Sequence, residues 1–258
     1  MNWRYTPPVI SLSVNVNKVA TIRNARGGDV PSVIAACETC ISAGAPGITI
    51  HPREDERHIT AVDVEEVAAF LAPRREAVEF NIEGDPRPDL MARVRRHRPH
   101  QCTLVPVRPG EITSEAGWLP KRDRDTLGPV IAELRGLGIR VSLFVEPKDA
   151  AIEWAAELGA DRVELYTEPY ARAFEQGLDA GRRSLETYAA AATRAHSLGL
   201  GINAGHDLDL DNLPLFATLP YLDEVSIGHA LHSRALFEGM AKVVGEYLAV
   251  LRDADGPR

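Results

Sequence analysis

Residues 47–58, GITIHPREDERH, join a buried strand directly to a group of charged side chains. The first four residues alternate small and β-branched side chains, which is typical of a short buried strand. His51 and Arg53 follow at once, two residues apart, so both side chains can point to the same side. In α/β enzymes the chemistry lies at the carboxyl ends of parallel strands. The segment therefore predicts a parallel β-sheet with functional side chains at its carboxyl edge.

Two interpretations of these charged residues are open. In one, residues 54–57 form a solvated loop whose acidic and basic side chains pair with one another. In the other, they contribute to a site. A histidine that closes an apolar strand, as His51 does, is either a packed core residue or a site residue, and the other strand ends must decide.

A strand, a loop and a helix recur in this order along the chain. The first strand begins near Pro8 and ends with Asn15 and Asn17; residues 18–28 after it are predicted as a loop, and Asp29 as the cap of the next helix. Further strands are predicted at residues 47–51, 78–83, 101–105, 138–146, 161–166, 199–204 and 222–228. Helices are predicted at residues 30–43, 61–71, 88–98, 125–137, 147–158, 182–198, 210–217 and 230–252.

Strands that alternate with helices in this way predict a (β/α)8 TIM barrel with extra helices, formed by residues 1–258 as a single domain. The length matches the roughly 250 residues typical of that fold. An open doubly wound sheet is the alternative, but it usually carries a GxGxxG turn after its first strand, and RNARGG is not one. Residues 167–181 are too many for a plain loop, so we expect an extra helix or a lid there.

The composition restricts the class of partner. The formal net charge is −8, and no basic run is long enough to follow a nucleic-acid backbone. The chain starts with polar residues and has no apolar run of roughly 18 residues, so we expect no membrane partner and a cytoplasmic protein that binds small anions. Cys37 and Cys40 form a CxxC in a helical pattern and are expected on a buried helix face rather than at a metal or redox site.

Polar side chains stand at the ends of nearly all predicted strands. Strand ends of a barrel converge on one mouth, where histidines and a partly desolvated glutamate suit proton transfer near neutral pH. A metal site built from the histidines and Glu83 is conceivable, but no HxH or HExxH spacing supports it, so no metal is expected. The expected mouth residues are Asn15, Asn17, His51, Arg53, Asn81, Glu83, Thr103, Glu146, Glu164, Tyr166, Asn203, His206, Ser226 and His229.

A structural role is the alternative for each of these side chains taken singly. Asn81 could satisfy backbone groups, and Glu164 could pair with a core arginine such as Arg162 or Arg140. Three histidines and a glutamate at one mouth are harder to explain as packing. No serine or cysteine carries a nucleophile signature, and Lys18 is the only lysine expected at the mouth.

Gly-His turns follow the last two predicted strands, in AGHDLDLDNL and SIGHALHSRAL. Each turn brings backbone N–H groups, a helix N-terminus and an imidazole together, which suits a phosphate group. In barrels the loops after strands seven and eight commonly bind phosphate. Arg26, Arg53 and His58 could hold a second anion across the mouth. The sequence therefore favours a pair of phosphorylated small-molecule substrates.

Several blocks of the sequence carry a family resemblance from about Val9 to Tyr247. They are SVNVNKVATIRNARGG, GITIHPREDERHIT, EFNIEG, TLVP with EITSEAGW, DRVELYTEPYA, INAGHDLDLDNL and DEVSIGHAL. Together they resemble the pyridoxine 5′-phosphate synthase family. The resemblance implies a barrel with added helices that forms a homo-octamer. It also implies a condensation of 3-amino-2-oxopropyl phosphate with 1-deoxy-D-xylulose 5-phosphate, releasing phosphate and water without a metal or an organic cofactor.

The same resemblance implies roles for single residues. Position by position, His51 is the proton acceptor, Glu83 the glutamate base and His206 the proton donor, and the strand-end argument selects the same three. The implied contacts of the amino-ketone phosphate are Asn15, Arg26, Asp207, Gly228 and His229. Those of the deoxyxylulose phosphate are Arg53, His58 and Thr113.

The chain departs from the common family pattern at two places. Asn17 and Lys18 stand where many members have Asp-His, and Asp207 stands where many have glycine. A branch of the family shares both changes, so we interpret them as lineage variation. Lys18 is predicted to bind an anion or a hydroxyl group, with a solvated lysine as the alternative. The contacts of Asn17 stay open.

Two other functions deserve a test. Another sugar-phosphate barrel enzyme, an isomerase or an aldolase, would use the same phosphate loops and would turn over one phosphorylated substrate alone. A non-catalytic paralogue would bind a phosphometabolite and regulate a partner, but binding alone has no use for Glu83 beside two phosphates.

Overall fold

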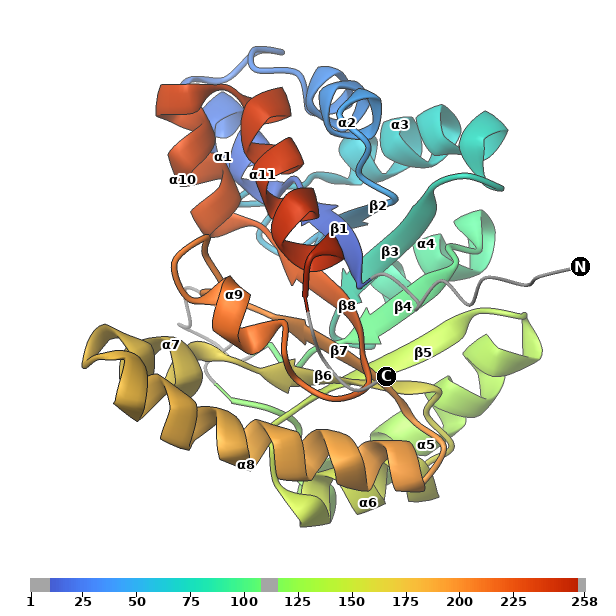
Figure 1. The fold of residues 1–258 in the computed structure, drawn as a ribbon. Helices are drawn as coiled ribbons and strands as arrows, with labels where there is room; N and C mark the ends of the chain where they lie inside the picture. The colour runs from blue at the N-terminus through green and yellow to red at the C-terminus, as the bar shows by residue number, and fades with distance from the viewer. Residues whose placement is uncertain (1–9, 108–115, 255–258) are drawn as a thin grey trace, which may run out of the picture.

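The strands of this protein close into a barrel in a computed structural model that describes residues 10–107 and 116–254. All strand pairs are parallel, each strand pairs with the next along the chain, and the last pairs with the first (Figure 1). The predicted (β/α)8 TIM barrel is confirmed. The strands are β1 (Ser11–Asn15), β2 (Gly47–Ile50), β3 (Glu79–Gly84), β4 (Gln101–Leu104), β5 (Arg140–Val145), β6 (Arg162–Tyr166), β7 (Gly201–Gly205) and β8 (Leu222–Ile227).

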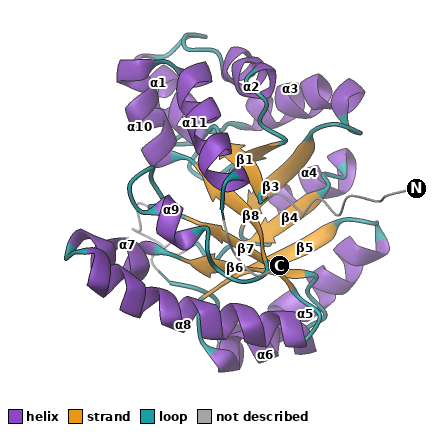
Figure 2. Cartoon of the chain, viewed as in Figure 1, coloured by secondary structure: helices purple, strands orange, loops and turns teal. Residues whose placement is uncertain are grey.

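Helices surround the strands on the outside of the barrel (Figure 2). The extra helix expected within residues 167–181 is present as α7 (Glu168–Glu175). None of the helices in the described part of the chain is long and apolar enough to cross a membrane. The others are α1 (Asn17–Arg26), α2 (Val33–Ser42), α3 (Ala61–Leu71), α4 (Pro88–His97), α5 (Pro120–Gly136), α6 (Asp149–Glu157), α8 (Leu178–Ser197), α9 (Leu213–Phe216), α10 (His229–Glu238) and α11 (Met240–Arg252), with a short 3-10 helix, η1 (Ala72–Arg74).

The segment after β1 is a helix, so the prediction of a loop at residues 18–28 was wrong. The sequence NKVATIRNAR has little amphipathic contrast, which hides α1 from a reading of its pattern. Oδ1 of Asn15 accepts from the backbone N–H of Asn17 at 3.1 Å and starts the helix. Arg23 and Arg26 in the last turn suit the helix dipole, and Gly27 ends the helix with a φ of 80°.

Two helix boundaries also differ from the prediction. The cap of α2 is Ser32, whose Oγ accepts from the N–H of Ala35 at 3.2 Å, and not Asp29. The single helix predicted at residues 230–252 is two helices, α10 and α11, because Gly239 between them has a φ of 88°. A glycine reaches that conformation without steric cost, so the chain can turn there.

Alternation along the strands separates an apolar outer layer from a polar interior. On β3, Phe80 and Ile82 belong to the buried hydrophobic core, whereas Asn81 and Glu83 between and after them make polar contacts inside the barrel. Each fully buried apolar side chain of this kind stabilises the fold by roughly 1.5–3 kcal/mol. The core therefore holds the barrel together while its interior stays free for polar groups.

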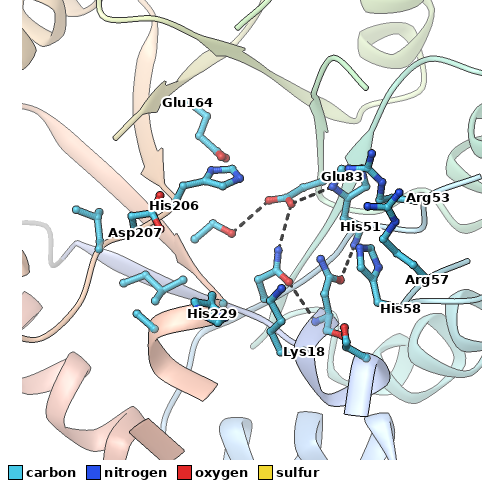
Figure 3. Close-up of a pocket in the computed structure, with 18 residues that line it drawn as sticks. Lys18, His51, Arg53, Arg57, His58, Glu83, Glu164, His206, Asp207 and His229 are labelled. Atoms are coloured by element: carbon cyan, nitrogen blue, oxygen red, sulfur yellow. Dashed lines mark hydrogen bonds and ion pairs between the residues drawn. The ribbon is translucent and has the colours of Figure 1, made fainter. Parts of the chain in front are cut away.

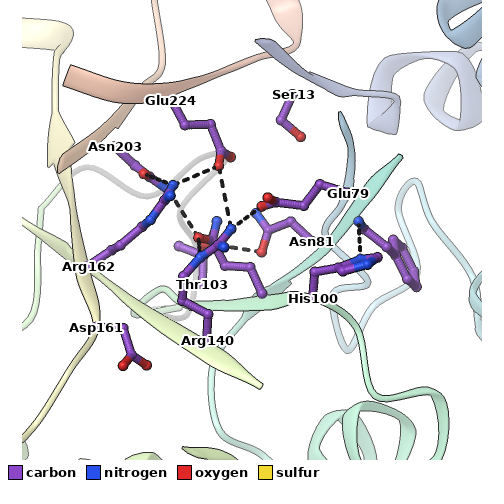
Figure 4. Close-up of polar contacts among 12 residues, drawn as sticks. Ser13, Glu79, Asn81, His100, Thr103, Arg140, Asp161, Arg162, Asn203 and Glu224 are labelled. Atoms are coloured by element: carbon purple, nitrogen blue, oxygen red, sulfur yellow. Dashed lines mark hydrogen bonds and ion pairs between the residues drawn. The ribbon is translucent and has the colours of Figure 1, made fainter. Parts of the chain in front are cut away.

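The amino-terminal end of the barrel holds a partly buried ion-pair cluster around the buried Glu224 (Figure 4). Arg162 donates to Glu224 at 3.1 Å and to Oδ1 of Asn203 at 2.8 Å, and Arg140 pairs with Glu79. Buried charges require such partners. The core arginines thus pair with Glu224, a residue that the sequence did not single out, and not with Glu164.

Candidate active site

A pocket of about 460 Å³ lies at the carboxyl ends of the strands. Its side chains come from strands and loops far apart in the sequence and point toward one another (Figure 3). The lining residues are Asn15, Asn17, Lys18, Thr21, His51, Arg53, Arg57, His58, Glu83, Glu164, His206, Asp207, Leu208, Ser226, Ile227, Gly228, His229 and Ala230.

The pocket contains every residue to which the family resemblance gave a catalytic or substrate-binding role, except two. Arg26 is exposed in the last turn of α1 and does not line the pocket, so this structure does not bring it beside Arg53 and His58. Thr113 lies outside the described residues. The roles of both stay predictions.

Five residues expected at the mouth lie elsewhere, and their placement there was wrong. Thr103 donates to Oδ1 of Asn81 at 3.2 Å inside the barrel, and Asn203 accepts from the ion-pair cluster below. Glu146 pairs with Lys148 outside the pocket. The fifth is Tyr166 at the end of β6. Its ring packs against that of His206, with 6.2 Å between the ring centroids. Strand ends are staggered in a barrel, so equal positions along different strands differ in depth.

Glu83, at the end of β3, is held at both carboxyl oxygens. Oε2 accepts from Nδ2 of Asn15 at 3.2 Å, and Oε1 accepts from Oγ of Ser226 at 3.2 Å. Burial raises the pKa of Glu83 to about 7, against the opposing effect of the Ser226 hydrogen bond. A carboxyl with this pKa can exchange a proton near neutral pH.

His51 lies beside Glu83, with Nδ1 4.0 Å from Oε2. Burial, followed by the positive charge of neighbours such as Arg53, lowers the pKa of His51 well below its usual value, so the imidazole is neutral at pH 7. Its Nε2 is buried and has no hydrogen-bond partner among the described residues. His58 packs edge-on against it at 6.1 Å between ring centroids, and burial lowers its pKa to about 4.

His206 follows β7 in the left-handed region, with a φ of 73°, and Asp207 after it has a φ of 53°. Thr167 donates to the carbonyls of Gly205 and His206 and fixes this turn. The ring of Phe144 packs against the imidazole at 5.2 Å between centroids. Burial lowers the pKa of His206, although the negative charge of Asp207 opposes the effect. Glycine adopts such a positive φ without steric cost, and aspartate tolerates it better than most other residues.

Glu164 on β6 is a pocket residue to which the sequence assigned no role. It is 1% exposed, and its Oε2 has no hydrogen-bond partner in the part of the chain that the structure describes. Burial, followed by the charge of Glu83, raises its pKa well above the usual value. Burial therefore favours the protonated form of the Glu164 carboxyl. The sequence shows that Glu164 lies near the end of a strand, which indicates a position close to the pocket. It does not show that Glu164 lines the pocket whereas Asn203, its partner on the next strand, does not.

Positive and polar groups line the rest of the pocket. Lys18 reaches it from α1, and Arg53 and Arg57 reach it from the loop after β2, where Arg53 is 6% exposed. Arg57 also pairs with Asp55, so the pairing expected among residues 54–57 is present although Arg57 lines the pocket as well. Within residues 10–107 and 116–254, no three histidine, cysteine, aspartate or glutamate side chains cluster in a way that could hold a metal ion. The cations and the helix start described next suit anionic ligands.

Gly228 and His229 place the N-terminus of α10 at the pocket. A side chain at Gly228 would bring a Cβ to 3.2 Å from both Cβ and the backbone O of Asn15, so β1 and this turn would have to move apart by a few tenths of an ångström. Unpaired N–H groups at the start of a helix are a common anion site.

Nearly the whole chain is similar in sequence to one known family. Residues 12–253 match the family described as pyridoxal phosphate biosynthesis protein PdxJ. The chain belongs to this family. Among curated members, pyridoxine 5′-phosphate synthase of Bacteroides fragilis (strain YCH46) is 52% identical over 242 residues, covering 93% of this chain and 99% of that protein. The enzyme of the same name from Leptospira biflexa is 48% identical over 250 residues, covering 93% and 96%.

Solved structures with much lower identity share the barrel. Tryptophan synthase from M. tuberculosis superposes with a TM-score of 0.65 at 14% identity, covering 95% of this chain and 93% of that chain. Phosphoribosyl anthranilate isomerase from Thermus thermophilus gives a TM-score of 0.55 at 15% identity, covering 94% and 98%. At such identity these structures show the fold alone. Assignment to the PdxJ family rests on the sequence, and it confirms the resemblance seen in the motifs.

Proposed function

We propose that the pocket condenses 3-amino-2-oxopropyl phosphate with 1-deoxy-D-xylulose 5-phosphate into pyridoxine 5′-phosphate, phosphate and water. Membership in the PdxJ family supports this reaction, as do curated relatives named pyridoxine 5′-phosphate synthase at about half identity. The observation that carries the proposal is the buried pair of His51 and Glu83, whose facing atoms are 4.0 Å apart at a pocket lined by cations. The chain acts as a ring-closing enzyme of the transferase type.

In this reaction three side chains move protons. Glu83, with a pKa of about 7, acts as the general base, and neutral His51 accepts a proton at Nε2, which has no partner among the described residues. His206 acts as the proton donor across the pocket. Its pKa is low in the free protein, but two bound phosphates would raise it because negative charge favours the imidazolium form. Substrate binding therefore favours the protonated form of His206, which can donate a proton.

Two anion sites fit the two phosphates. The amino-ketone phosphate sits at the start of α10, on Gly228 and His229. The sugar phosphate meets Arg53, His58 and Lys18, which line the pocket between β1 and the loop after β2. Asn15 and Asp207 complete the amino-ketone side.

The test is to mix the enzyme with both substrates and with each one alone. The proposal expects pyridoxine 5′-phosphate and an equimolar amount of inorganic phosphate only in the complete mixture. Turnover of one phosphorylated substrate alone would identify an isomerase or an aldolase instead. Binding of both without turnover would identify a non-catalytic paralogue.

We also propose that the chain forms a homo-oligomer in the cytoplasm, an octamer if it follows the family resemblance. Adjoining helices α1 and α10 carry exposed apolar side chains: Ile22 is 46% exposed, Leu236 69% and Phe237 90%. Large exposed apolar groups are typical of surfaces covered in an assembly. The cytoplasmic location fits the cysteines of the described residues, all of them free and buried.

A further inference from the structure

The junction between β1 and α1 links the proposed base to the proposed proton acceptor. Nδ2 of Asn15 donates to Oε2 of Glu83, and Oδ1 of the same residue accepts from the backbone N–H of Asn17. Oδ1 of Asn17 accepts in turn from the backbone N–H of His51 at 2.9 Å. His51 Nδ1 faces Oε2 of Glu83 at 4.0 Å (Figure 3). The four residues therefore form a closed ring of contacts.

The hydrogen bonds in this ring of contacts restrict which residue types can occupy positions 15 and 17. Asn15 must donate to a carboxylate and accept from an N–H, which an aspartate could not do. At Asn17 the contact to His51 requires only an acceptor. Asn17 is 9% exposed and His51 8%, so a His51 N–H without its acceptor would be buried and unpaired. Such a group is unfavourable, and the backbone would shift to find another partner.

We propose that Asn17 is a positioning residue whose side-chain carbonyl fixes the backbone of His51 and thereby sets its imidazole against Glu83. The proposal rests on the proposed function only for the roles of His51 and Glu83. It assigns Asn17 a contact within the protein, whereas the neighbouring Lys18 faces the substrates.

An amide at this position accepts the hydrogen bond without placing a charge near His51. The low pKa of His51, caused by burial and positive neighbours, keeps its imidazole neutral. A carboxylate at position 17 would accept the same hydrogen bond and would raise that pKa. The charged and titratable groups that face His51 are Arg53 and His58 on its own loop, Glu83 on β3, Arg87 before α4 and His206 after β7.

Two substitutions separate geometry from charge. Asn17→Leu removes the acceptor at similar volume, and kcat should fall roughly tenfold or more while the KM of each substrate changes less than about threefold. Asn17→Asp restores the acceptor. Its kcat should recover to within about threefold of wild type at alkaline pH. The acid limb of the profile should move to higher pH, because the added negative charge raises the pKa of Glu83 as well as that of His51.

Asn24→Leu is the matched control on the same helix. Nδ2 of Asn24 donates to the carbonyls of Glu56 and His58, so it also ties α1 to the loop after β2 but does not touch His51. This variant should raise the KM of the sugar phosphate and leave the pH profile of kcat unchanged. The proposal is overturned if Asn17→Leu keeps its kcat and raises KM, or if folded Asn17→Asp shows no recovery at any pH.

A readout without turnover separates this proposal from the proposed function. In an NMR titration of the histidine rings, Asn17→Asp should raise the midpoint of His51, and Asn24→Leu should leave it unchanged. A wild type that makes no pyridoxine 5′-phosphate overturns the proposed function, while the titration still decides the role of Asn17. If Asn17→Leu does not fold, the aspartate variant carries the test, and an unchanged His51 midpoint in it contradicts the proposal.

Discussion

The hydroxyl of Ser226 donates to Oε1 of Glu83 at 3.2 Å and so joins the last strand of the barrel to the third. Asn15 on the first strand binds the other oxygen, Oε2. A carboxyl held from two directions cannot rotate freely, and its burial keeps its pKa near 7. The closed barrel thus orients the general base from strands that are remote in the sequence.

Glu83→Gln should abolish the base without disturbing its surroundings. The new amide can accept from Asn15 and donate to Ser226, so we expect kcat to fall roughly 10²-fold or more with the fold retained. His51→Asn should likewise lower kcat roughly 10²-fold or more with the fold retained. Steady-state kinetics together with circular dichroism check both variants. Full activity in a folded variant would remove that residue from the mechanism.

The same substitution should change how stability depends on pH. The pKa of Glu83 rises from 4.5 to about 7 on folding, so the wild type loses stability as pH rises through that window. Glu83→Gln has no such loss. Its melting temperature should match that of wild type near pH 4 and exceed it at pH 8, by an amount equivalent to roughly 1–3 kcal/mol. Calorimetric melting at the two pH values measures the difference, and an equal difference at both would contradict the raised pKa.

The pH profile of kcat/KM should have its acid limb near pH 7. Glu83 must be ionised to act as a base, and its pKa of about 7 sets the limb, whereas His51 is already neutral at lower pH because its pKa is lowered. Rates measured from pH 5.5 to 9 check this. A limb near pH 4.5 would show that Glu83 titrates like an exposed carboxyl.

Gly228→Ala should weaken the site for the amino-ketone phosphate. The added Cβ would lie 3.2 Å from the backbone O of Asn15, so the turn and Asn15 must move apart. Because Asn15 holds Glu83, kcat should fall as well. Calorimetry should show weaker binding of the amino-ketone phosphate and unchanged binding of the sugar phosphate. Equal losses for both would indicate general damage to the barrel.

Lys18→Ala should raise the KM for 1-deoxy-D-xylulose 5-phosphate roughly tenfold, equivalent to about 1.4 kcal/mol, with a much smaller change in kcat. Lys18→Arg keeps the charge and is the matched control. An unchanged KM in the alanine variant would favour a solvated lysine. A collapse of kcat that added alkylamine restores would instead show that the amine takes part in the chemistry.

Phe237→Asp should shift the protein to smaller assemblies, because it places a charge on the most exposed apolar side chain of α10. Val62 on α3 is 65% exposed, and Val62→Asp is the matched control that should leave the assembly intact. Size-exclusion chromatography with light scattering measures both. A monomeric wild type would contradict the proposed oligomer.

The sequence by itself determined the barrel and the positions of His51, Glu83 and His206. Buried strands and the turns after them are local patterns, and a polar residue directly after an apolar strand marks the carboxyl edge wherever the strand lies. The Gly-His turns were recognisable for the same reason, since a turn and a helix start need only a few consecutive residues.

Only the tertiary structure decided how deep each strand-end residue lies and which residues it meets. The register places Glu164 beside Asn203 on the next strand, yet Glu164 lines the pocket and Asn203 binds Arg162 below it. The sequence could not separate these, because stagger between neighbouring strands follows from closing the whole barrel. Likewise, Asn17 and His51 are 34 residues apart along the chain. Asn17 reaches the backbone of His51 only because β1 and β2 are paired.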